Sequence, residues 1–407
     1  MTTDTEVLVI GGGATGAGVA RDLALRGRDV TLVDRGGLAD GTTARSHGLL
    51  HSGARYAEAD ATGAEECIAE NRTIRDIAGA AIADTGGLFV QLAEDDPEYF
   101  DAKREACEAC GIDVDVFDGD EARAAVPDLA GGVERAMRVP DAVVSPSRLV
   151  AANARDAADR GAAVRYGSPV EGIRVDDGSV AGVAVGGALD ETIHPEMVVN
   201  ATGAWAGELA AMAGASVEMR PTRGLMVSVD YPALGTVLNR CREPGDGDIV
   251  VPHEREAVLG TTSVAVEDPD DYERADWERE RVREECAAMC PPLSDAAEVR
   301  EWWGVRPLYE PDEADRGGRG ISRGFFLLDH ADEGVENFLS VVGGKLTTYR
   351  LMAEATADAV CDRLGVDEPC RTAAEPLPGA DDPAALDRFV ADIGGPGPSD
   401  SDTAGRT

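Results

Sequence analysis

The sequence predicts an α/β fold in which a Rossmann-like nucleotide-binding domain is interrupted by an inserted β-rich α+β domain. Residues 5–34 have the pattern strand, helix, strand, with a Gly-x-Gly-x-x-Gly motif at the first strand–helix junction. Two further strand–glycine–helix patterns lie far along the chain, at 196–205 and 338–365. Between them, residues 217–265 contain short apolar strand patterns separated by turns. These observations indicate a discontinuous nucleotide-binding domain with a substrate domain inserted into it.

The first βαβ unit carries the residues of a dinucleotide site. EVLVI and DVTLVD are short apolar runs typical of buried parallel strands. Gly11 permits the tight turn, Gly13 lets the backbone approach a pyrophosphate, and Gly16 lets helix and strand pack closely. The free N–H groups at the start of the helix favour phosphate, and Asp34 can accept hydrogen bonds from a ribose. A glycine-rich turn without a ligand is the alternative, and it does not explain Asp34.

The spacing of the later units favours FAD over NAD. A classical NAD dehydrogenase keeps its βαβ units consecutive, whereas NATG at 200–203 and VVGGKLTTYR at 341–350 lie far from the first unit. This dispersion is typical of flavin folds of the D-amino-acid-oxidase/glutathione-reductase type, whose late Gly-Gly helix stabilises negative charge on the reduced flavin. We therefore predict an FAD-binding domain from residues 1–60, 140–215 and 336–370 and a substrate-binding cap domain from 61–139 and 216–335. We predict a flexible C-terminal tail at 371–407, in which one short helix at 383–393 is possible.

The composition is strongly acidic. With 38 basic and 77 acidic residues, the formal net charge is −39. This charge argues against nucleic acid as a partner, because a phosphate backbone requires a basic surface. The acidic residues are spread over the whole chain, which fits an ordinary solvated surface or adaptation to a salty cytoplasm, where screening reduces self-repulsion. We predict halophilic adaptation, with loss of structure as salt falls.

Targeting and metal signals point to a cytoplasmic protein without a metal site. The N-terminus lacks a signal-peptide pattern, and no apolar run approaches the roughly 18–20 residues that span a bilayer. We expect a cytoplasmic chain, at most peripheral on the inner face of the cell membrane. Cys107 and Cys110 form a CxxC pair that no second pair at zinc-finger spacing accompanies, so we expect buried thiols and no metal.

Several strings of the sequence resemble the FAD-dependent sn-glycerol-3-phosphate dehydrogenases. They occur in order between about residues 5 and 380: GGGATGAGVARDLALRG, GTTARSHGLLHSGARY, VNATGAW, GVRPL, SRGFFLLDH and GGKLTTYRLMAE. The likeness is closest to the large A-type subunit of the anaerobic enzyme, and the Gly-Leu-Met run at 224–226 agrees with that branch. Large subunits of this family continue into a cysteine-rich domain, and we expect this chain to lack it.

The resemblance implies an activity and its partners. It implies oxidation of sn-glycerol 3-phosphate to dihydroxyacetone phosphate, with hydride transfer to flavin N5 and electrons passed to quinone or to partner electron-transfer subunits. It also implies a set of site residues. His51 and Arg306 are the implied catalytic residues. The implied substrate-binding residues are Arg55, Arg306, Arg323 and Lys345, and the implied FAD contacts are Gly11, Gly13, Gly16, Asp34, Thr42, Thr43, Ser46, Gly203, Gly343, Gly344, Lys345 and Thr347.

The residues themselves support the same chemistry. A phosphate monoester carries a charge of roughly −1.5 to −2 near neutral pH, so an acidic protein needs a local basic pocket to hold it. Arg306 and Arg323 lie beside apolar, glycine-flanked segments and can bind phosphate oxygens bidentately. A neutral histidine suits removal of the hydroxyl proton, and we favour His51. The motif leaves His47 and Tyr56 without a role.

Other interpretations remain open at this level. An arginine can form a surface ion pair, and His51 can have an orienting or packing role. The chain can also be an oxidase of the same superfamily that acts on an amino acid or a 2-hydroxy acid. A third possibility is a non-catalytic flavin-binding subunit.

Overall fold

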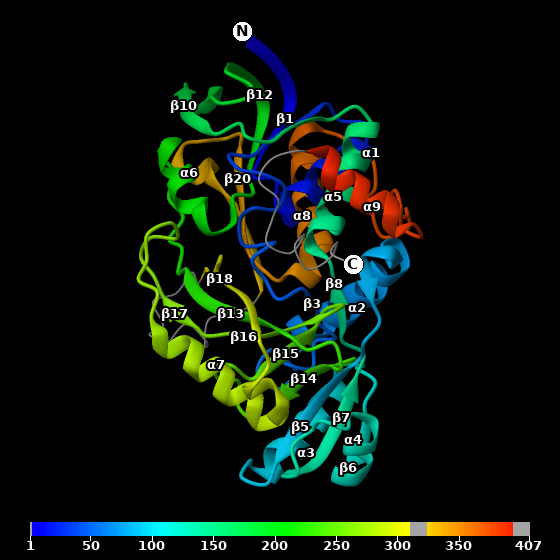
Figure 1. The fold of residues 1–407 in the computed structure, drawn as a ribbon. Coiled ribbons are helices and arrows are strands. Elements are labelled where there is room, and N and C mark those ends of the chain that lie inside the picture. The colour runs from blue at the N-terminus through cyan, green and yellow to red at the C-terminus, as the bar shows by residue number, and fades with distance from the viewer. Residues whose placement is uncertain (1, 310–323, 394–407) are drawn as a thin grey trace.

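The computed structural model describes residues 2–309 and 324–393. Figure 1 shows an elongated molecule, with a sheet flanked by helices at one end and a second, larger sheet extending to the other. A small third sheet lies between them and is made of β3 (Leu49–Leu50), β4 (Ile82–Ala83) and β8 (Ala142–Val144).

The first sheet is the predicted nucleotide-binding sheet. Its strand order is β10-β11-β12-β1-β2-β9, with β20 paired to β12 and β19 paired to β20. Strands β1, β2, β9, β12 and β20 pair in parallel, so segments from three distant parts of the chain share one sheet, as predicted. The strands are β1 (Thr2–Ile10), β2 (Val30–Val33), β9 (Ala163–Arg165), β10 (Val170–Asp176), β11 (Ser179–Val185), β12 (Glu191–Asn200), β19 (Phe325–Asp329) and β20 (Phe338–Gly343).

Helices cover this sheet through small and aliphatic side chains. Val19 and Leu23 of α1 pack with Val341 of β20 and Met352 of α8 in one buried cluster. Ser145 caps α5 by accepting from the Arg148 N–H, and Pro146 occupies its first turn, both favourable at a helix start. The helices here are α1 (Ala14–Leu25), α2 (Ala61–Ile77), α5 (Pro146–Asp159), α6 (Ala206–Met212), α8 (Tyr349–Leu364) and α9 (Pro383–Ile393).

The second sheet forms the inserted β-rich region. Its strand order is β17-β13-β16-β15-β14-β5-β7-β6, with β18 paired to β13. Its strands are β5 (Gly87–Leu92), β6 (Asp115–Asp118), β7 (Val133–Val139), β13 (Thr222–Asp230), β14 (Val237–Arg240), β15 (Ile249–Pro252), β16 (Glu256–Gly260), β17 (Val264–Ala265) and β18 (Glu298–Arg306). The helices in this region are α3 (Pro97–Ala109), α4 (Gly119–Ala125) and α7 (Asp276–Met289), and α7 packs on the sheet through Val282, Cys286 and Met289.

Single-turn 3-10 segments connect these elements. They are η1 (Gly79–Ala81), η2 (Gly203–Trp205), η3 (Pro291–Ser294), η4 (His330–Glu333) and η5 (Leu346–Thr348). Within the described ranges, no helix is both long and apolar enough to cross a membrane.

Two elements lie on the other side of the predicted domain boundary. Helix α2 falls in the range predicted for the cap, but the buried Glu70 carboxylate accepts from Arg350 Nε of α8 at 2.9 and 3.1 Å. Strand β19 also falls in the predicted cap range, yet it pairs with β20 of the first sheet. Apolar periodicity identifies a helix or strand, but it does not say which of two sheets will receive it.

The predicted flexible tail is wrong for residues 371–393, and the short helix considered possible at 383–393 is present as α9. Leu377 and Leu386 are buried, and Arg21 NH2 donates to the Glu375 carbonyl at 2.6 Å. Helix α9 packs on α5, as Figure 1 shows. The Pro- and Gly-rich composition suggested a linker, but a few apolar residues at helical spacing are enough to anchor this segment. Residues 394–407 lie outside the described residues.

The cysteines are free thiols that lie mostly in the core. Cys107 lies at the buried side of α3 and Cys110 follows that helix, as the prediction of buried thiols required. Burial raises the pKa of the Cys107 thiol to about 12, so this side chain is an uncharged core group at neutral pH.

Candidate active site

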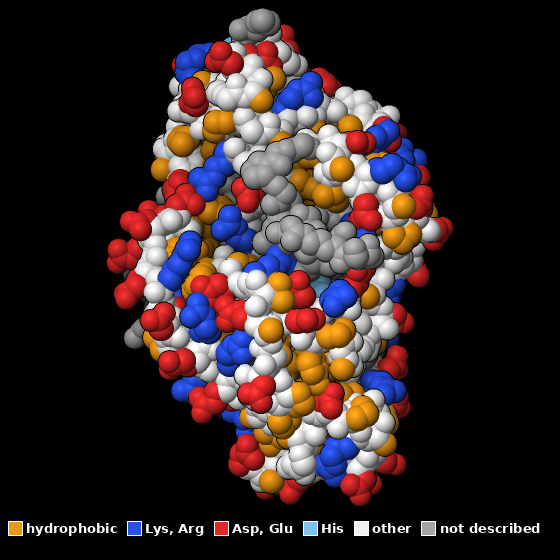
Figure 2. All heavy atoms as spheres, viewed as in Figure 1, with side chains coloured by type: hydrophobic (Ala, Val, Ile, Leu, Met, Phe, Trp, Pro, Cys, Tyr) orange, Lys and Arg blue, Asp and Glu red, His pale blue; other side chains and the backbone are white. Residues whose placement is uncertain are grey.

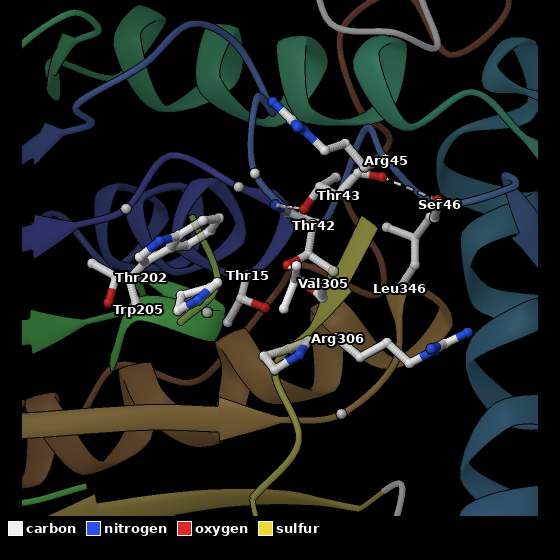
Figure 3. A pocket seen from close by; sticks show the side chains of 18 of the residues that line it. Thr15, Thr42, Thr43, Arg45, Ser46, Thr202, Trp205, Val305, Arg306 and Leu346 are labelled. Carbon is white, nitrogen blue, oxygen red and sulfur yellow. Dashed lines mark hydrogen bonds between the residues drawn. The ribbon is translucent and has the colours of Figure 1, made fainter. Parts of the chain in front are cut away.

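A cavity of about 990 Å³ lies between the two large sheets. Ile10 and Val33 pair across β1 and β2, and Ile10 also pairs with Asn200 of β12, so these strands end together at the cavity. In open α/β sheets, ligands bind at the carboxyl ends of the strands. Figure 3 shows Thr42, Thr43 and Ser46 on one side of this cavity and Arg306 on the other.

The glycine motif forms a tight turn at the end of β1. Gly11 has a φ of +108°, and a Cβ there would lie 2.4 Å from the Ala201 carbonyl oxygen. A Cβ on Gly16 would collide with the Gly11 carbonyl, so these glycines are required for strand–helix packing. No side chain caps α1 at Gly13, and Gly13 and Ala14 line the cavity. Apart from the Ala14 N–H, which donates to Thr43 Oγ1, the N–H groups of the first turn of α1 can receive a phosphate group.

Asp34 lies directly after β2 at the rim of the same turn. Its carboxylate accepts from the Gly12 N–H at 2.6 Å and from the Gly36 N–H at 2.7 Å. Burial raises the pKa of this carboxyl, while the two backbone amides oppose the shift by stabilising the charged form. The two amides fix the side chain at the cavity wall, where a ribose hydroxyl can reach it.

The loop after β2 supplies the predicted hydroxyl groups, and the protein itself uses each of them. Thr43 Oγ1 accepts from the Ala14 N–H at 3.1 Å, and Ser46 Oγ donates to the Thr43 carbonyl at 3.0 Å. Thr42 Oγ1 donates to the Val305 carbonyl at 2.6 Å and so joins the loop to β18. All three residues line the cavity. Their hydroxyls stabilise the loop that forms its wall.

The late Gly-Gly turn closes the opposite side of the cavity. Gly343 and Gly344 have φ values of +79° and +73°, and Gly203 at the end of β12 has +62°. A Cβ on Gly343 would lie 2.6 Å from the Gly324 carbonyl oxygen, so this turn requires glycine. These glycines line the cavity, whereas the buried side chain of Thr347 lies outside its lining.

Lys345 follows this turn and points into the cavity region. Its Nζ is enclosed and has no hydrogen-bond partner among the described residues. It lies 4.8 Å from the centre of the Tyr56 ring, a cation–π distance. A buried ammonium normally has acceptors, so this group indicates a missing anionic or carbonyl partner. Lys103, the other lysine, lies away from the cavity and donates to the Ala54 carbonyl and to Glu58.

His51 is held beside this turn by its backbone. Its N–H donates to Thr347 Oγ1 at 3.0 Å, and its carbonyl accepts from Asn71 Nδ2 at 3.2 Å. Its Nε2 lies 3.4 Å from the Tyr56 hydroxyl. The half-buried His51 ring lines the cavity, next to the Tyr56 hydroxyl.

Two of the predicted arginines lie in the same cavity. Arg306 NH2 donates to the Thr262 carbonyl at 2.9 Å and to Thr261 Oγ1 at 3.2 Å, which fixes the guanidinium. Arg55 NH2 donates to the buried Asp248 carboxylate at 2.7 Å. The predicted substrate residue Arg323 lies outside the described residues.

His47 is a cavity residue whose role the sequence motif left open. Its Nδ1 is enclosed and has no hydrogen-bond partner in the described part of the chain. Its carbonyl oxygen lies 3.1 Å from His253 Nε2. Burial lowers the pKa of His47 to about 3, and the nearby charges of Arg306 and Arg55 act in the same direction. His47 is therefore a neutral imidazole at neutral pH, four residues before His51.

Near the Asp34 end of the cavity, Arg35 of the nucleotide-binding region contacts the inserted region. The sequence motifs did not predict this contact. The Arg35 guanidinium lies 4.4 Å from the centre of the Trp205 ring. Arg35 NH2 also donates to both carboxylate oxygens of Asp270, at 3.0 and 3.1 Å. Asp270 belongs to the inserted region, and all three residues line the cavity. The signal in the sequence was the tryptophan directly after the NATGA string.

The residues present fit FAD. The turn at Gly13 can receive a pyrophosphate, Asp34 can receive a ribose, and the volume lies at the upper end for ligand pockets. The enclosed Lys345 Nζ lacks an acceptor among the described residues, and a flavin carbonyl or an anion would supply one. These features come from both ends of one cavity, as an elongated dinucleotide requires.

Comparison with known proteins gives a consistent result. Residues 6–358 match the family model described as FAD dependent oxidoreductase. The chain is 50% identical over 409 residues to the A1 subunit of anaerobic glycerol-3-phosphate dehydrogenase from Haloferax volcanii, covering 97% of this chain and 70% of that protein. It is 42% identical over 392 residues to the corresponding A-type subunit of the Escherichia coli K12 enzyme, covering 94% and 71%.

Solved structures share the fold. The glycerol-3-phosphate dehydrogenase of Bacillus halodurans, complexed with FAD, superimposes with a TM-score of 0.72 at 26% identity, covering 96% of this chain and 71% of that one. The L-alpha-glycerophosphate oxidase of Mycoplasma pneumoniae, with FAD bound, has a TM-score of 0.72 at 18% identity, covering 92% and 99%, which shows the fold alone. The chain is an FAD-binding member of the FAD-dependent oxidoreductase family and, within it, belongs to the family of A-type subunits of anaerobic glycerol-3-phosphate dehydrogenase.

Proposed function

We propose that the protein oxidises sn-glycerol 3-phosphate to dihydroxyacetone phosphate with FAD and passes the electrons to quinone. The supporting observation is that Arg55, Arg306 and Lys345 line one cavity with His51 in a chain of net charge −39. These three basic side chains beside an imidazole suit an anionic alcohol. The names of the relatives in the A-type family point to the same substrate.

The basic residues are proposed to bind the substrate phosphate. Arg306 is suited to this because its guanidinium is already oriented by Thr261 and the Thr262 carbonyl, so little side-chain entropy remains to be lost. Arg55 is oriented by Asp248 in the same way. Lys345 adds a second type of cation beside the flavin-binding turn. The assignment of Arg323 stays a prediction.

The proposed chemical step separates a proton and a hydride from one secondary alcohol. His51 accepts the proton of the C2 hydroxyl at its imidazole, while the C2–H bond breaks and the C2–O bond becomes a carbonyl. When bound, FAD supplies the hydride acceptor at flavin N5. Two electrons leave the substrate as hydride, and the products are dihydroxyacetone phosphate and a protonated His51. Release of that proton to solvent restores the base.

The electron acceptor is the finer part of the proposal. We infer that quinone, reached directly or through partner subunits, reoxidises the flavin, in the cytoplasm or at the inner face of the membrane. The relatives are named as one subunit of a larger enzyme, which supports partner chains. An oxidase of the same superfamily would instead deliver the electrons to O₂ and release peroxide.

The test is an anaerobic titration of the FAD-loaded protein with glycerol 3-phosphate in high salt. Bleaching of the flavin absorbance and formation of dihydroxyacetone phosphate in equal amounts are expected. A flavin that amino acids or 2-hydroxy acids bleach, and glycerol 3-phosphate does not, would support the oxidase alternative. A flavin that none of these compounds reduces would indicate a non-catalytic subunit. Reoxidation by a water-soluble quinone, compared with O₂ and peroxide yield, identifies the acceptor.

A further inference from the structure

Tyr56 lies between His51 and Lys345 at the cavity wall. Its hydroxyl is 3.4 Å from His51 Nε2, and the two ring centres are 5.2 Å apart at an angle of 61°. On its other side, Lys345 Nζ lies 4.8 Å from the centre of the Tyr56 ring. All three residues line the cavity. The tyrosine thus contacts the two side chains that the proposed reaction assigns to proton transfer and to anion binding.

A rigid turn sets the distance between Tyr56 and His51. The Tyr56 N–H donates to the Gly53 carbonyl at 2.8 Å, and the Asp60 N–H donates to the Tyr56 carbonyl at 2.8 Å. Gly53 has a φ of +97°, and a Cβ there would lie 2.4 Å from the Ala64 carbonyl oxygen. The turn that carries Tyr56 is therefore hydrogen-bonded on both sides and packed closely against the start of α2.

Both protonation states of His51 can use the Tyr56 hydroxyl. When the Tyr56 hydroxyl accepts from His51 Nε2–H, the neutral ring keeps its lone pair on Nδ1 for the substrate proton. The protonated ring still carries Nε2–H, so the contact persists before and after proton transfer. A hydrogen bond at one ring nitrogen also selects the tautomer of a neutral histidine. The cation over its face in turn restricts the Tyr56 ring. No net proton is taken from the tyrosine in this arrangement.

We propose that Tyr56 is a positioning residue that orients the His51 ring and selects its tautomer for the oxidation step; this rests on the proposed function of His51. Tyr56 then acts on the reaction only through His51. Removing the Tyr56 hydroxyl therefore lowers the rate of flavin reduction much more than it lowers the affinity for the substrate. A tyrosine that instead bound the substrate phosphate would mainly raise KM.

The kinetic test is a double-mutant cycle on the FAD-loaded protein. Flavin reduction at saturating glycerol 3-phosphate is followed by stopped flow for the wild type, Y56F, H51Q and Y56F/H51Q. We expect H51Q to lower the rate at least ~10²-fold and Y56F to lower it ~10-fold, with FAD retained in both. The double variant should be no slower than H51Q, because Tyr56 has no base left to orient.

The matched control is Y231F. Tyr231 also donates its hydroxyl to a side chain, Asp128, but it does not line the cavity. Y231F should reduce flavin at the wild-type rate. Additive losses in the cycle, or a rise in KM with an unchanged maximal rate in Y56F, would overturn the positioning role. If glycerol 3-phosphate does not reduce the flavin of the wild-type protein, both the proposed function and this inference are contradicted.

A spectroscopic readout separates positioning from general damage. The chain has five histidines, so ring ¹⁵N signals of labelled protein are few, and the signal missing in H51Q identifies His51. Y56F should change the ring-nitrogen shifts of His51 while leaving those of His194 and His330 in place. This measurement requires folded protein and no turnover. Unchanged His51 shifts in Y56F would overturn the proposal.

Discussion

The backbone N–H of His51 donates to Thr347 Oγ1 at 3.0 Å, although 296 positions separate the two residues. Thr347 is fully buried, and its hydroxyl faces His51 rather than the cavity. The contact joins the histidine segment after β3 to the turn that carries Gly343, Gly344 and Lys345. One side chain therefore joins the proposed base to the turn proposed to bind the flavin.

Replacing Thr347 by valine tests this relation. T347V keeps the shape of the side chain but leaves the His51 N–H without its acceptor, which should lower the free energy of unfolding by about 1–3 kcal/mol. The shifted backbone should also lower the rate of flavin reduction ~10-fold. T347S keeps the hydroxyl and serves as the control. Urea unfolding and stopped flow check both effects, and a T347V protein with wild-type values contradicts them.

Arg306 is expected to decide recognition of the phosphate. Truncating a charge-assisted contact costs about 1.5–3 kcal/mol, so R306A should lower kcat/KM for glycerol 3-phosphate about 10- to 100-fold. R306K keeps the charge but loses the planar, bidentate geometry, and should recover only part of this loss. Unphosphorylated glycerol is the control substrate, since R306A and the wild type should oxidise it equally slowly. An unchanged kcat/KM for the phosphate ester would contradict the assignment.

Asp270 is expected to slow the release of FAD. Its pair with Arg35 joins the inserted region to the sheet beside Asp34, next to Trp205. The pair is about half exposed, so its contribution is small and sensitive to salt. D270N should release FAD ~2- to 5-fold faster at the lowest salt that keeps the protein folded, and the difference should disappear in molar salt.

The matched control for D270N is D176N. Asp176 pairs with Arg174 at a similarly exposed position on β10, and neither lines the cavity. Flavin fluorescence after dilution measures the rate of release. A salt-independent effect of D270N, or an equal effect of D176N, would show that the Arg35 contact does not retain FAD.

His47 and His253 should make folding sensitive to acid. Burial lowers the pKa of both rings; Arg306 and Arg55 add to the shift at His47, and Arg300 adds to it at His253, where the His47 carbonyl and Glu256 oppose it. Above pH ~6.5 each ring is neutral in both the folded and unfolded states. As pH falls below that value, the unfolded chain binds protons that the folded chain excludes, so stability falls toward pH 3.

The variant H47Q isolates this contribution. Its free energy of unfolding should fall less than that of the wild type between pH 7 and pH 5. Between pH 7 and pH 8, the difference between the two proteins should be constant. Urea unfolding at each pH provides the measurement, and parallel curves over the whole range would contradict a neutral, buried His47.

The acidic surface should make stability depend on salt. Figure 2 shows acidic side chains spread over the visible face, in a chain of net charge −39. Self-repulsion weakens as the Debye length falls from about 10 Å at 0.1 M to about 3 Å at 1 M salt. We expect the melting temperature to rise steadily between these concentrations and the protein to lose structure at low salt. A melting temperature independent of salt would contradict the prediction.

Local patterns were sufficient for the parts of the site that lie within one stretch of chain. The glycines at 11, 13 and 16, Asp34 and the Gly343–Gly344 turn all follow predicted strands, and all line the cavity except Gly16, which packs the helix on the strand. Such units can be recognised in a sequence from strand and helix periodicity and from glycines, which readily adopt positive φ. The family resemblance then brought His51, Arg55, Arg306 and Lys345 together, and the structure places all four in one cavity.

Local sequence patterns did not predict contacts between distant segments of the chain. Nothing local indicates that Thr347 turns its hydroxyl to His51, or that Glu70 of α2 pairs with Arg350. The packing of α9 against α5 was likewise not predictable from a tail whose composition resembles a linker. Each of these contacts depends on which surfaces the packed sheets bring together.

For this protein, the sequence alone determined the nucleotide-binding βαβ unit, the type of fold, the acidic character and the set of candidate residues. These follow from short-range stereochemistry and from residue type. Only the tertiary structure decided how Tyr56, Thr347 and Lys345 surround His51, and how Asp270 reaches Arg35. Those relations join segments up to 296 positions apart, and a side chain's partners at such separations are set by packing and burial rather than by its neighbours in the chain.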